Sequence, residues 1–278
     1  MLAAPGHFHR VIAVPCSFSP VPWTTARQRL RSVRIGRHLH SHVQLGRLAP
    51  VNAPGTVLLA DVVGSRRVAD FAGRRDRLLS EASRRHRQQG LTTTAYAVTA
   101  WDEFQAMVGD LGSVPSVVWD LRVRFFPLRL RVAIGWGLVS TVPSPGGEVN
   151  KQGSGPAFES ARGAMDEIKR QKGVRLRAAT RVATGSTDFD SVANTLYRLH
   201  DALLRRITAR QWEVVLAQER QPTQGETAAA LRVDKSTVSR TLARAAYWEL
   251  RESVATLGAL LEQRRVVAPS DTTSLNCI

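Results

Sequence analysis

The stretch that decides the fold is TAYAVTAWDEFQAMV, Thr94 to Val108. A mostly apolar run leads to Trp101, two carboxylates follow side by side, and a second apolar run closes the stretch. This order predicts a hairpin with strands at about 93–101 and 103–108 and with Asp102 and Glu103 at its tip. Two carboxylates between core strands cost free energy unless solvent, a cation or a basic partner meets them. The hairpin therefore marks a candidate site as well as a fold.

The segment before the hairpin predicts a strand and a helix. The run GTVLLADVVGSR is a continuous apolar strand that begins near Thr56 and ends at Asp61. A long helix follows and stops at Gly90. Its inward positions share roughly helical spacing: Val68, Phe71, Leu78, Leu79 and Ala82.

The segment after the hairpin continues the alternation of helices and strands. A short helix is expected near 114–124, and LRLRVAIGWG then alternates as a strand from Leu128. GPAFESARGAMDEIKRQKG predicts a helix with Pro156 in its first turn, and VRLRAATRV a last strand. The order β-α-β-β-α-β, followed by a helix and a strand, predicts an α+β fold with a ferredoxin-like sheet and helices on one face.

The C-terminal third is entirely helical in pattern. A connector helix carries one apolar stripe: Phe189, Val192, Leu196, Leu199, Leu203 and Ile207. Two capping boxes, Thr208 with Gln211 and Thr223 with Glu226, each begin a short helix, and Asp234 caps a third. A final helix continues from Trp248. Its stripe is Leu250, Val254, Leu257 and Leu261.

The charge is concentrated at the N-terminus. The chain of 278 residues has a formal net charge of +16, and residues 1–60 contain no Asp or Glu. We interpret this segment as a disordered basic arm; a transit-like peptide, or upstream sequence from an early start site, are the alternatives. The predicted organisation is an arm at 1–53, a sheet domain at 54–185, the connector at 186–207, a helical domain at 208–265 and a disordered tail at 266–278.

Cysteine usage and hydropathy indicate a cytoplasmic protein. Cys16 and Cys277 both lie in the tails, so neither a disulfide framework nor a zinc site can be built from them. No apolar run approaches the roughly 20 residues that a membrane span requires, so no membrane partner is expected. The excess of positive charge favours a polyanionic partner.

The stretch TAAALRVDKSTVSRTL, at 227–242, resembles the helix-turn-helix of sigma-factor region four. Apolar side chains bury the helix crossing, and the outer face of the second helix would enter the major groove of DNA. The residues on that face are Lys235, Ser236, Thr237, Ser239 and Arg240. Thr223 and Gln224 are placed to meet a phosphate through backbone N–H groups.

Two features of this module leave alternatives open. Arg232 stands where the family usually has Gly in the turn, so a left-handed backbone there would carry a cost. The local net charge is small, so tight DNA binding would need the basic arm or a homodimer through the C-terminal helix. An ordinary three-helix packing module and a protein-contact module remain the alternatives.

The carboxylates form the second candidate site. Asp61 ends the first strand, and Asp102 tips the hairpin expected to pair beside it. Two carboxylates at a strand end suit Mg²⁺ and phosphates, and a loop of Gly64, Ser65 and Arg66 lies next to them. The N–H groups of Gly64 and Ser65, at the entry to a helix, would favour an anion.

Four motifs, ADVVGSR, WDEFQ, RVAIGWG and GPAFESAR, together resemble the SatD family over about residues 56–169. They are similar, more distantly, to the palm domains of class III nucleotide cyclases and diguanylate cyclases. That likeness implies a metal site for Mg²⁺ at Asp61 and Asp102. The backbone carbonyl of Val62 and the side-chain carboxylate of Glu103 would be further ligands. It also implies that Arg66 faces a triphosphate.

The sequence departs from those cyclases at two positions. Trp101 replaces a Gly before the hairpin aspartate, where an indole could close the approach of a nucleotide, and Phe158 replaces an Asn. Three interpretations of the carboxylates stay open: a solvated hairpin tip with Asp61 capping the next helix, binding of a nucleotide or metal without turnover, and cyclase or polymerase chemistry. His86, His200 and the arginines of the first helix are expected at the surface.

The sequence as a whole favours a DNA-binding transcriptional regulator whose sheet domain binds a nucleotide, Mg²⁺ or both. The second hypothesis is a metal-dependent nucleotidyl cyclase or nucleotidyltransferase tethered to a DNA-binding module. The third is a protein-interaction module.

Overall fold

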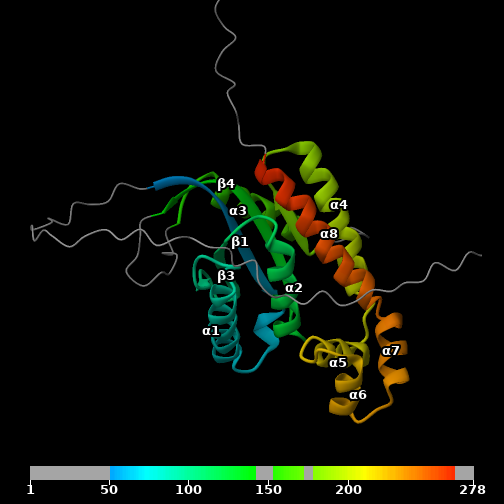
Figure 1. Cartoon of the computed structure of the whole chain (residues 1–278). Helices are drawn as coiled ribbons and strands as arrows, with labels where there is room; N and C mark the ends of the chain where they lie inside the picture. Colours follow the sequence, from blue (N-terminus) through cyan, green and yellow to red (C-terminus); the bar gives the residue numbers. More distant parts are fainter. Residues whose placement is uncertain (1–50, 142–152, 172–177, 267–278) are drawn as a thin grey trace, which may run out of the picture. The chain divides into compact units, whose positions relative to one another are not determined.

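The structure is a computed structural model that describes residues 51–141, 153–171 and 178–266. These residues form one five-stranded sheet and eight α-helices (Figure 1). The strands are β1 (Val51–Val63), β2 (Ala97–Val98), β3 (Glu103–Val108), β4 (Arg129–Thr141) and β5 (Thr180–Ala183). The helices are α1 (Phe71–Gln88), α2 (Val114–Phe125), α3 (Pro156–Arg170), α4 (Thr187–Leu204), α5 (Ala209–Gln218), α6 (Gln224–Leu231), α7 (Lys235–Arg244) and α8 (Tyr247–Val266).

The sheet has the strand order β2-β3-β1-β4-β5. β1 lies in its centre and pairs antiparallel with β3 on one side and β4 on the other, and β2 pairs antiparallel with β3 at the edge. β5 runs parallel to β4 at the opposite edge, with α3 between them in the chain. The mixed α+β class and the predicted order of elements are confirmed.

Helices pack on both faces of the sheet, not on one face as the sequence predicted. Leu58, Ala60 and Val62 of β1 point into a core shared with α1, α2, α4 and the C-terminal part of α8. Val57 and Leu59 point the other way, into a core with α3. Because β1 is apolar on both sides, each face needs a cover, and α3 supplies the second one.

The approach of α3 to the sheet depends on Gly135 in β4. A Cβ atom at this position would lie 2.0 Å from the carbonyl oxygen of Ala157 and 2.5 Å from the backbone nitrogen of Ala161. Only a glycine lets the helix backbone pack this closely on the strand. The close packing brings the whole length of α3 over β1 and β4.

The C-terminal helices share a separate core. Side chains of α5, α6 and α7 pack with the first turns of α8 and with Trp119 of α2. The Trp119 ring lies 6.4 Å from the rings of both Trp212 and Tyr247. On α8, Leu250 and Val254 belong to this core, whereas Leu257 and Leu261 belong to the core of the sheet. The apolar stripe predicted for this helix is therefore buried within its own chain.

Both predicted capping boxes are present. Thr208 Oγ1 accepts a hydrogen bond from Gln211 N, and the Gln211 side chain accepts one from Thr208 N. Thr223 and Glu226 make the same pair at the start of α6. Asp234 precedes α7 as predicted, but its side chain makes no capping hydrogen bond.

Three predicted element boundaries were wrong. β1 begins at Val51, before the expected Thr56. The first hairpin strand has only two residues, because Met107 N donates to the hydroxyl of Thr94 and this side chain takes the place of a ladder carbonyl. A short 3₁₀ turn at Ser65–Arg67 separates β1 from α1, so α1 begins only at Phe71 and Val68 lies outside it.

The apolar stripe predicted for the connector helix is only partly buried. Val192 and Leu199 of α4 are 54% and 61% exposed, whereas Ala193 and Tyr197 pack into the core. The small Ala193 and the long Tyr197 place the buried face one position away from the face chosen from the sequence. The expected arm, the tail and both cysteines lie outside the described residues, apart from 51–53, which belong to β1, and Val266, which ends α8.

Both histidines expected at the surface are buried. His86 of α1 is fully buried; Nδ1 lies 2.8 Å from Tyr96 Oη and Nε2 lies 2.8 Å from Asp120 Oδ2. His200 of α4 lies with Nδ1 2.7 Å from Ser253 Oγ of α8. Each ring finds a polar partner on another element, so it can be buried despite its polar neighbours in sequence.

Candidate functional site

The acidic cluster joins β1 and β3. Asp61 lies directly opposite Glu103 in the antiparallel register, so both carboxylates point to the face covered by α3. Both residues are buried, at 4% and 6% exposure. Opposed buried carboxylates repel each other, and only nearby cations make this arrangement stable.

Three cations supply that compensation. Arg131 of β4 donates from Nη1 to Asp61 Oδ2 at 2.8 Å. Arg162 of α3 donates from Nη1 to both oxygens of Glu103 at 2.8 Å. Lys169, at the C-terminal end of α3, has Nζ 3.1 Å from Asp61 Oδ1 and 3.6 Å from Glu103 Oε2. The two carboxylates are thus ion-paired within the chain.

The side chain of Asp102 takes no part in these ion pairs of Asp61 and Glu103. Its backbone carbonyl accepts from Val62 N at 2.8 Å, so it does lie beside the end of β1. Its side chain accepts a hydrogen bond from the hydroxyl of buried Ser65 at 3.2 Å. Gly64 adopts a left-handed conformation with φ 77°, and Arg66 is exposed. Because the 3₁₀ turn intervenes, the N–H groups of Gly64 and Ser65 do not lie at the N-terminus of α1, contrary to the sequence expectation.

Asp61 and Glu103 do not fit a resident Mg²⁺ ion. A magnesium site takes carboxylate oxygens that are free to coordinate the ion. Here both oxygens of Asp61 and both of Glu103 already face an arginine or a lysine. Within the described ranges, no group of three or more His, Cys, Asp or Glu side chains is arranged to hold a metal. We therefore derive no chemistry through a metal at this site.

A hollow of about 620 Å³ adjoins the ion pairs between the sheet and α3. Thr99, Glu103 and Gln105 line it from the sheet side, and Phe158 and Arg162 line it from α3. Trp101 does not line it: its ring packs on Phe71, at a centroid distance of 5.7 Å, and Phe71 belongs to the core on the other face of the sheet. The indole thus does not close this hollow.

The α6–α7 unit is the second candidate site. Val233 N donates to Ala228 O at 3.0 Å and closes the turn between the helices. Arg232 in this turn has φ 54° and ψ 47°, the left-handed conformation that a glycine would adopt without strain. Ala228, Val238 and Leu242 are buried between the helices, as the sequence predicted.

The outer face of α7 is polar and open. Lys235, Ser236, Ser239 and Arg240 are exposed, and Thr237 is half-buried. At the start of α6, Thr223 is exposed and Gln224 is half-buried. Thr223 holds its N–H and its hydroxyl in hydrogen bonds with Glu226, which leaves the N–H of Gln224 and Gly225 at the helix N-terminus without an intrahelical acceptor.

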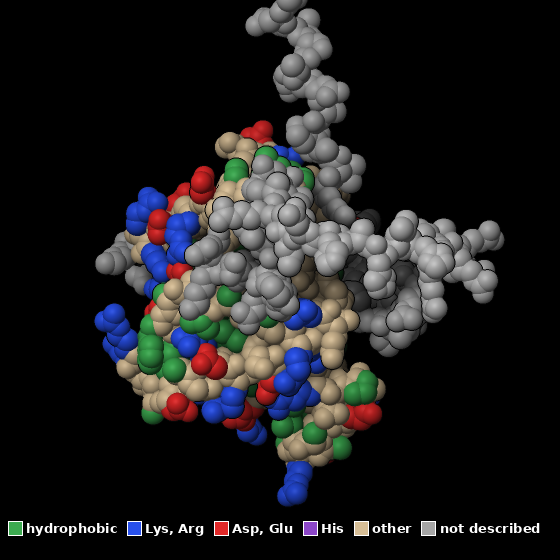
Figure 2. All heavy atoms as spheres, turned by 90° about the vertical axis from the view of Figure 1, so that its left-hand side faces the viewer, with side chains coloured by type: hydrophobic (Ala, Val, Ile, Leu, Met, Phe, Trp, Pro, Cys, Tyr) green, Lys and Arg blue, Asp and Glu red, His purple; other side chains and the backbone are tan. Residues whose placement is uncertain are grey.

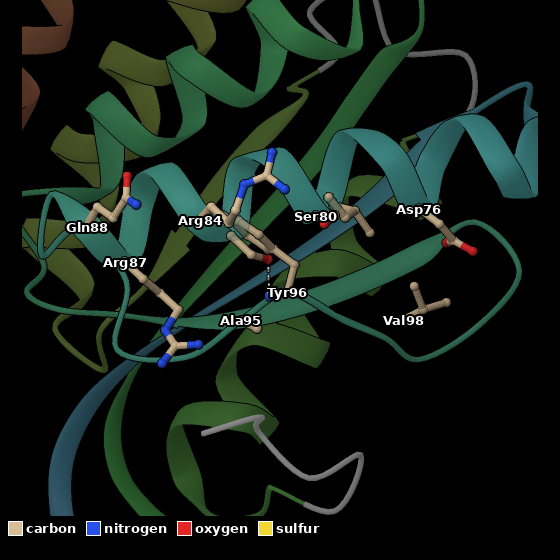
Figure 3. Close-up of a pocket in the computed structure, with 10 residues that line it drawn as sticks. Asp76, Ser80, Arg84, Arg87, Gln88, Ala95, Tyr96 and Val98 are labelled. Atoms are coloured by element: carbon tan, nitrogen blue, oxygen red, sulfur yellow. Dashed lines mark hydrogen bonds between the residues drawn. The ribbon is translucent and has the colours of Figure 1, made fainter. Parts of the chain in front are cut away.

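A second hollow, of about 700 Å³, runs between α1 and the segment before β2. Arg84, Arg87 and Gln88 project from α1, and Ala95 and Tyr96 come from the neighbouring segment (Figure 3). Arg75, by contrast, is buried and donates to the backbone carbonyl of Trp101, so it braces the hairpin instead of joining the solvated face expected for it. Figure 2 shows basic side chains spread over this side with acidic ones between them.

The basic partners of the acidic cluster were not predicted from the sequence. Arg131 follows the alternation of β4 and so faces away from Leu130 and Val132, which is a signal for a polar site on that face. Lys169 gave no such signal, because its partners lie on strands far away in the chain. Buried Arg122 and Asp201, which pair at 2.6 Å between α2 and α4, were also missed.

The described residues form a mixed α+β fold in which a five-stranded sheet is followed by a group of C-terminal helices. The SatD family model matches residues 56–246, more than half of the chain, and the chain belongs to the SatD family. No curated protein matches the chain.

Two solved structures show weak similarity. A bacterial light-regulated adenylyl cyclase aligns with a TM-score of 0.37 and 11% identity, over 49% of this chain and 44% of that chain. The chain thus spans less than half of that cyclase. A regulator of polyketide synthase expression from Bifidobacterium adolescentis aligns with a TM-score of 0.29 and 16% identity, over 77% and 82%. At these TM-scores neither similarity carries a conclusion about function.

In the part of the chain that the structure describes, no helix combines the length and the apolar character that crossing a membrane demands.

Proposed function

We propose that this SatD family member is a DNA-binding transcriptional regulator that reads duplex DNA with α7. The observation that carries the proposal is the exposed polar face of α7, held on a buried apolar crossing with α6. A helix-turn-helix needs this division: an apolar side fixes the second helix, and polar side chains reach base edges from the other side.

The charges on this unit support the same proposal. Lys235 lies in the first turn of α7, and Arg240 and Arg244 are exposed further along it. Lysine and arginine near a groove contact phosphates and guanine edges. The N-terminus of α6, with its free N–H groups, adds a place for a phosphate. In this proposal, the strand order of the sheet is that of a ferredoxin-like fold, and the sheet domain is the regulatory domain.

The experiment that tests the proposal measures binding of the full chain to a duplex selected from a random library. Fluorescence anisotropy at several salt concentrations gives the affinity and its salt slope. Lys235→Ala should weaken binding and lower the salt slope by about one, the value for one phosphate contact. Arg198→Ala, which removes an exposed arginine from α4, is the matched control. Its affinity for the duplex should be closer to that of the wild type than the affinity of Lys235→Ala is. Absence of duplex binding at low salt, or an equal loss in both variants, contradicts the proposal.

A second candidate function is nucleotide binding in the hollow beside α3. Phe158 offers a ring for a base, Gln105 offers an amide, and half-exposed Arg162 offers a positive charge for a phosphate. Because the neighbouring carboxylates are already ion-paired, binding should not depend on Mg²⁺. A thermal-shift assay with ATP and GTP, with and without Mg²⁺, tests this: a ligand that binds only the native state raises Tm. The rise should disappear in Phe158→Ala, and a rise that requires Mg²⁺ would show that the ion pairs do not exclude the metal.

A further inference from the structure

A hollow of about 470 Å³ lies where the end of α2 and the start of β4 meet α4 and α5. It is separate from the hollow beside α3 and from the outer face of α7, and the proposed function uses none of its residues. Its volume is in the range of pockets that take small organic molecules.

The walls of this hollow are largely apolar. Phe126 and Leu128 come from the link between α2 and β4. Leu204 ends α4, Trp212 lies in α5, and Ile207 lies in the link between these two helices. The rings of Phe126 and Trp212 are stacked, with centroids 5.1 Å apart. Such a lining favours an apolar body, since each group transferred from water onto these side chains contributes through the hydrophobic effect.

The polar groups of the lining are predominantly positive. Arg122 and Asp201 are its buried charged members, at 8% and 1% exposure. They pair at 2.6 Å, and the other carboxylate oxygen of Asp201 accepts from the backbone nitrogens of Ala179 and Thr180. Arg129 is exposed and also lines the hollow. Arg122 and Arg129 therefore face one carboxylate, Asp201, which is already engaged.

One buried donor in this lining is left over. Arg122 uses Nη2 for both Thr180 and Asp201, whereas Nη1 is buried and has no hydrogen-bond partner among the described residues. An unpaired buried guanidinium donor is costly. Because the chain covers this nitrogen, a ligand in the hollow meets the positive charge of Arg122 and not this donor. The excess positive charge selects an anionic acceptor over a neutral one.

We propose that this hollow binds a small amphipathic organic acid, with its apolar body against Phe126, Leu128 and Trp212 and its carboxylate beside Arg122 and Arg129. Ile207 and Trp212 also belong to the core of the helical unit, whereas Leu130 of the same lining belongs to the core of the sheet. A ligand in this hollow thus contacts the sheet domain and the helical unit at once.

The test uses 2-naphthoate as the probe and 2-naphthamide as its uncharged counterpart, titrated into the full chain by calorimetry. Naphthoate should bind one site per chain about tenfold or more tightly than the amide, because a charge-assisted hydrogen bond is lost with the charge. Ala209→Trp should abolish binding, since Ala209 lines the hollow and is exposed, so an indole there fills the space without entering the core.

Two further variants complete the design. Ala255→Trp places the same indole at an exposed position of α8 outside the hollow and should bind naphthoate as wild type does. Arg129→Gln, also exposed, should weaken naphthoate severalfold and leave the amide unchanged, and it keeps the test decisive if Ala209→Trp does not fold. No binding of naphthoate to the wild type, equal affinity for acid and amide, or unchanged binding in both hollow variants overturns the proposal.

Discussion

Asp61 of β1 and Glu103 of β3 are direct cross-strand partners, and one lysine, Lys169, reaches both carboxylates at 3.1 and 3.6 Å. The cross-strand pair lies on the face that α3 covers, so the helix brings the charge that the strands lack. The cluster therefore ties α3 to the sheet at its charged end, while Gly135 allows the close apolar contact further along.

Lys169→Met should destabilise the chain by about 1–2 kcal/mol. Removing one partner from a buried ion pair leaves an uncompensated charge, but Arg131 and Arg162 remain and Lys169 is partly exposed, so the full penalty for a buried pair is not reached. Urea unfolding measures the change. Arg210→Met, which breaks an exposed ion pair with Glu213, is the control and should cost less than about 0.5 kcal/mol. Equal effects would show that the cluster is not a structural tie.

Gly135→Ala should cost about 3 kcal/mol or more, because its Cβ would collide with the backbone of α3 and the helix would have to move. Gly163→Ala provides the contrast. Gly163 lies inside α3, and a methyl group at this position would meet open space, so alanine there should stabilise the chain by up to about 1 kcal/mol through helix propensity. Both values come from thermal or urea unfolding. A mild effect at Gly135 would contradict the close packing of α3 on β4.

The buried His200 predicts a dependence of stability on pH. Burial lowers the pKa of His200 to about 3 from its usual value near 6.5, and the positive charge of Arg122 is the second, smaller cause. Below pH 6.5 the unfolded chain binds a proton here that the folded chain does not, so stability falls as the pH falls. Between pH 6.5 and 5.0, protonation of His200 should lower the free energy of unfolding by about 1.5 kcal/mol. Above about pH 7.5 this residue should have no effect on it.

The measurement is the free energy of unfolding at pH 6.5 and 5.0, the interval set by linkage, for wild type and for His200→Gln. The variant should lose less stability over this interval than the wild type does. Equal losses in the two chains would mean that His200 is protonated as easily in the folded chain as in the unfolded one.

Local signals made part of the fold predictable. The capping boxes at Thr208 and Thr223 involve residues three positions apart, so the sequence alone locates the starts of α5 and α6. The alternation of inward and outward side chains that predicts β4 also depends only on residues close together in the chain. The buried His86 was not predictable, because its partners Tyr96 and Asp120 come from a different strand segment and a different helix.

The site was predictable only in its acidic half. Asp61 and Glu103 stand out as carboxylates beside apolar strands, whereas Lys169 and Arg162 resemble ordinary exposed residues of an amphipathic helix. Their role depends on α3 packing across the face of β1 and β3, which is a tertiary fact. The same holds for Arg122 and Asp201, which are brought together from α2 and α4.

Thr223→Ala and Thr208→Ala form a matched pair of capping variants. Each should cost about 1 kcal/mol of stability, because each removes a side-chain acceptor at a helix N-terminus. Only Thr223→Ala should also weaken DNA binding, because it loosens the first turn of α6, where the N–H groups of Gln224 and Gly225 would meet a phosphate. The loss should be equal for all sequences, since a phosphate contact carries no sequence information. Duplex binding by both variants, with stability measured in parallel, checks this. A change in sequence preference in Thr223→Ala would argue against a phosphate contact.

DNA reading by α7 is the central claim, and Arg240→Ala tests it most directly. Arg240 is exposed on the outer face and is long enough to make a bidentate contact with a guanine edge, so its loss should cost about 1–3 kcal/mol on the preferred duplex. The affinity for random duplex should fall much less, so the variant should discriminate less between bases at one base pair. Val238→Asp, at a fully buried position, should lose all binding by unfolding the unit.

The decisive measurement is the affinity of the full chain and of Arg240→Ala for the preferred duplex and for random duplex at one fixed salt concentration. We predict a loss confined largely to the preferred duplex, with the fold of the variant intact. Wild-type affinity of Arg240→Ala for both duplexes would contradict DNA reading by α7 and favour a protein partner for the same face of this helix.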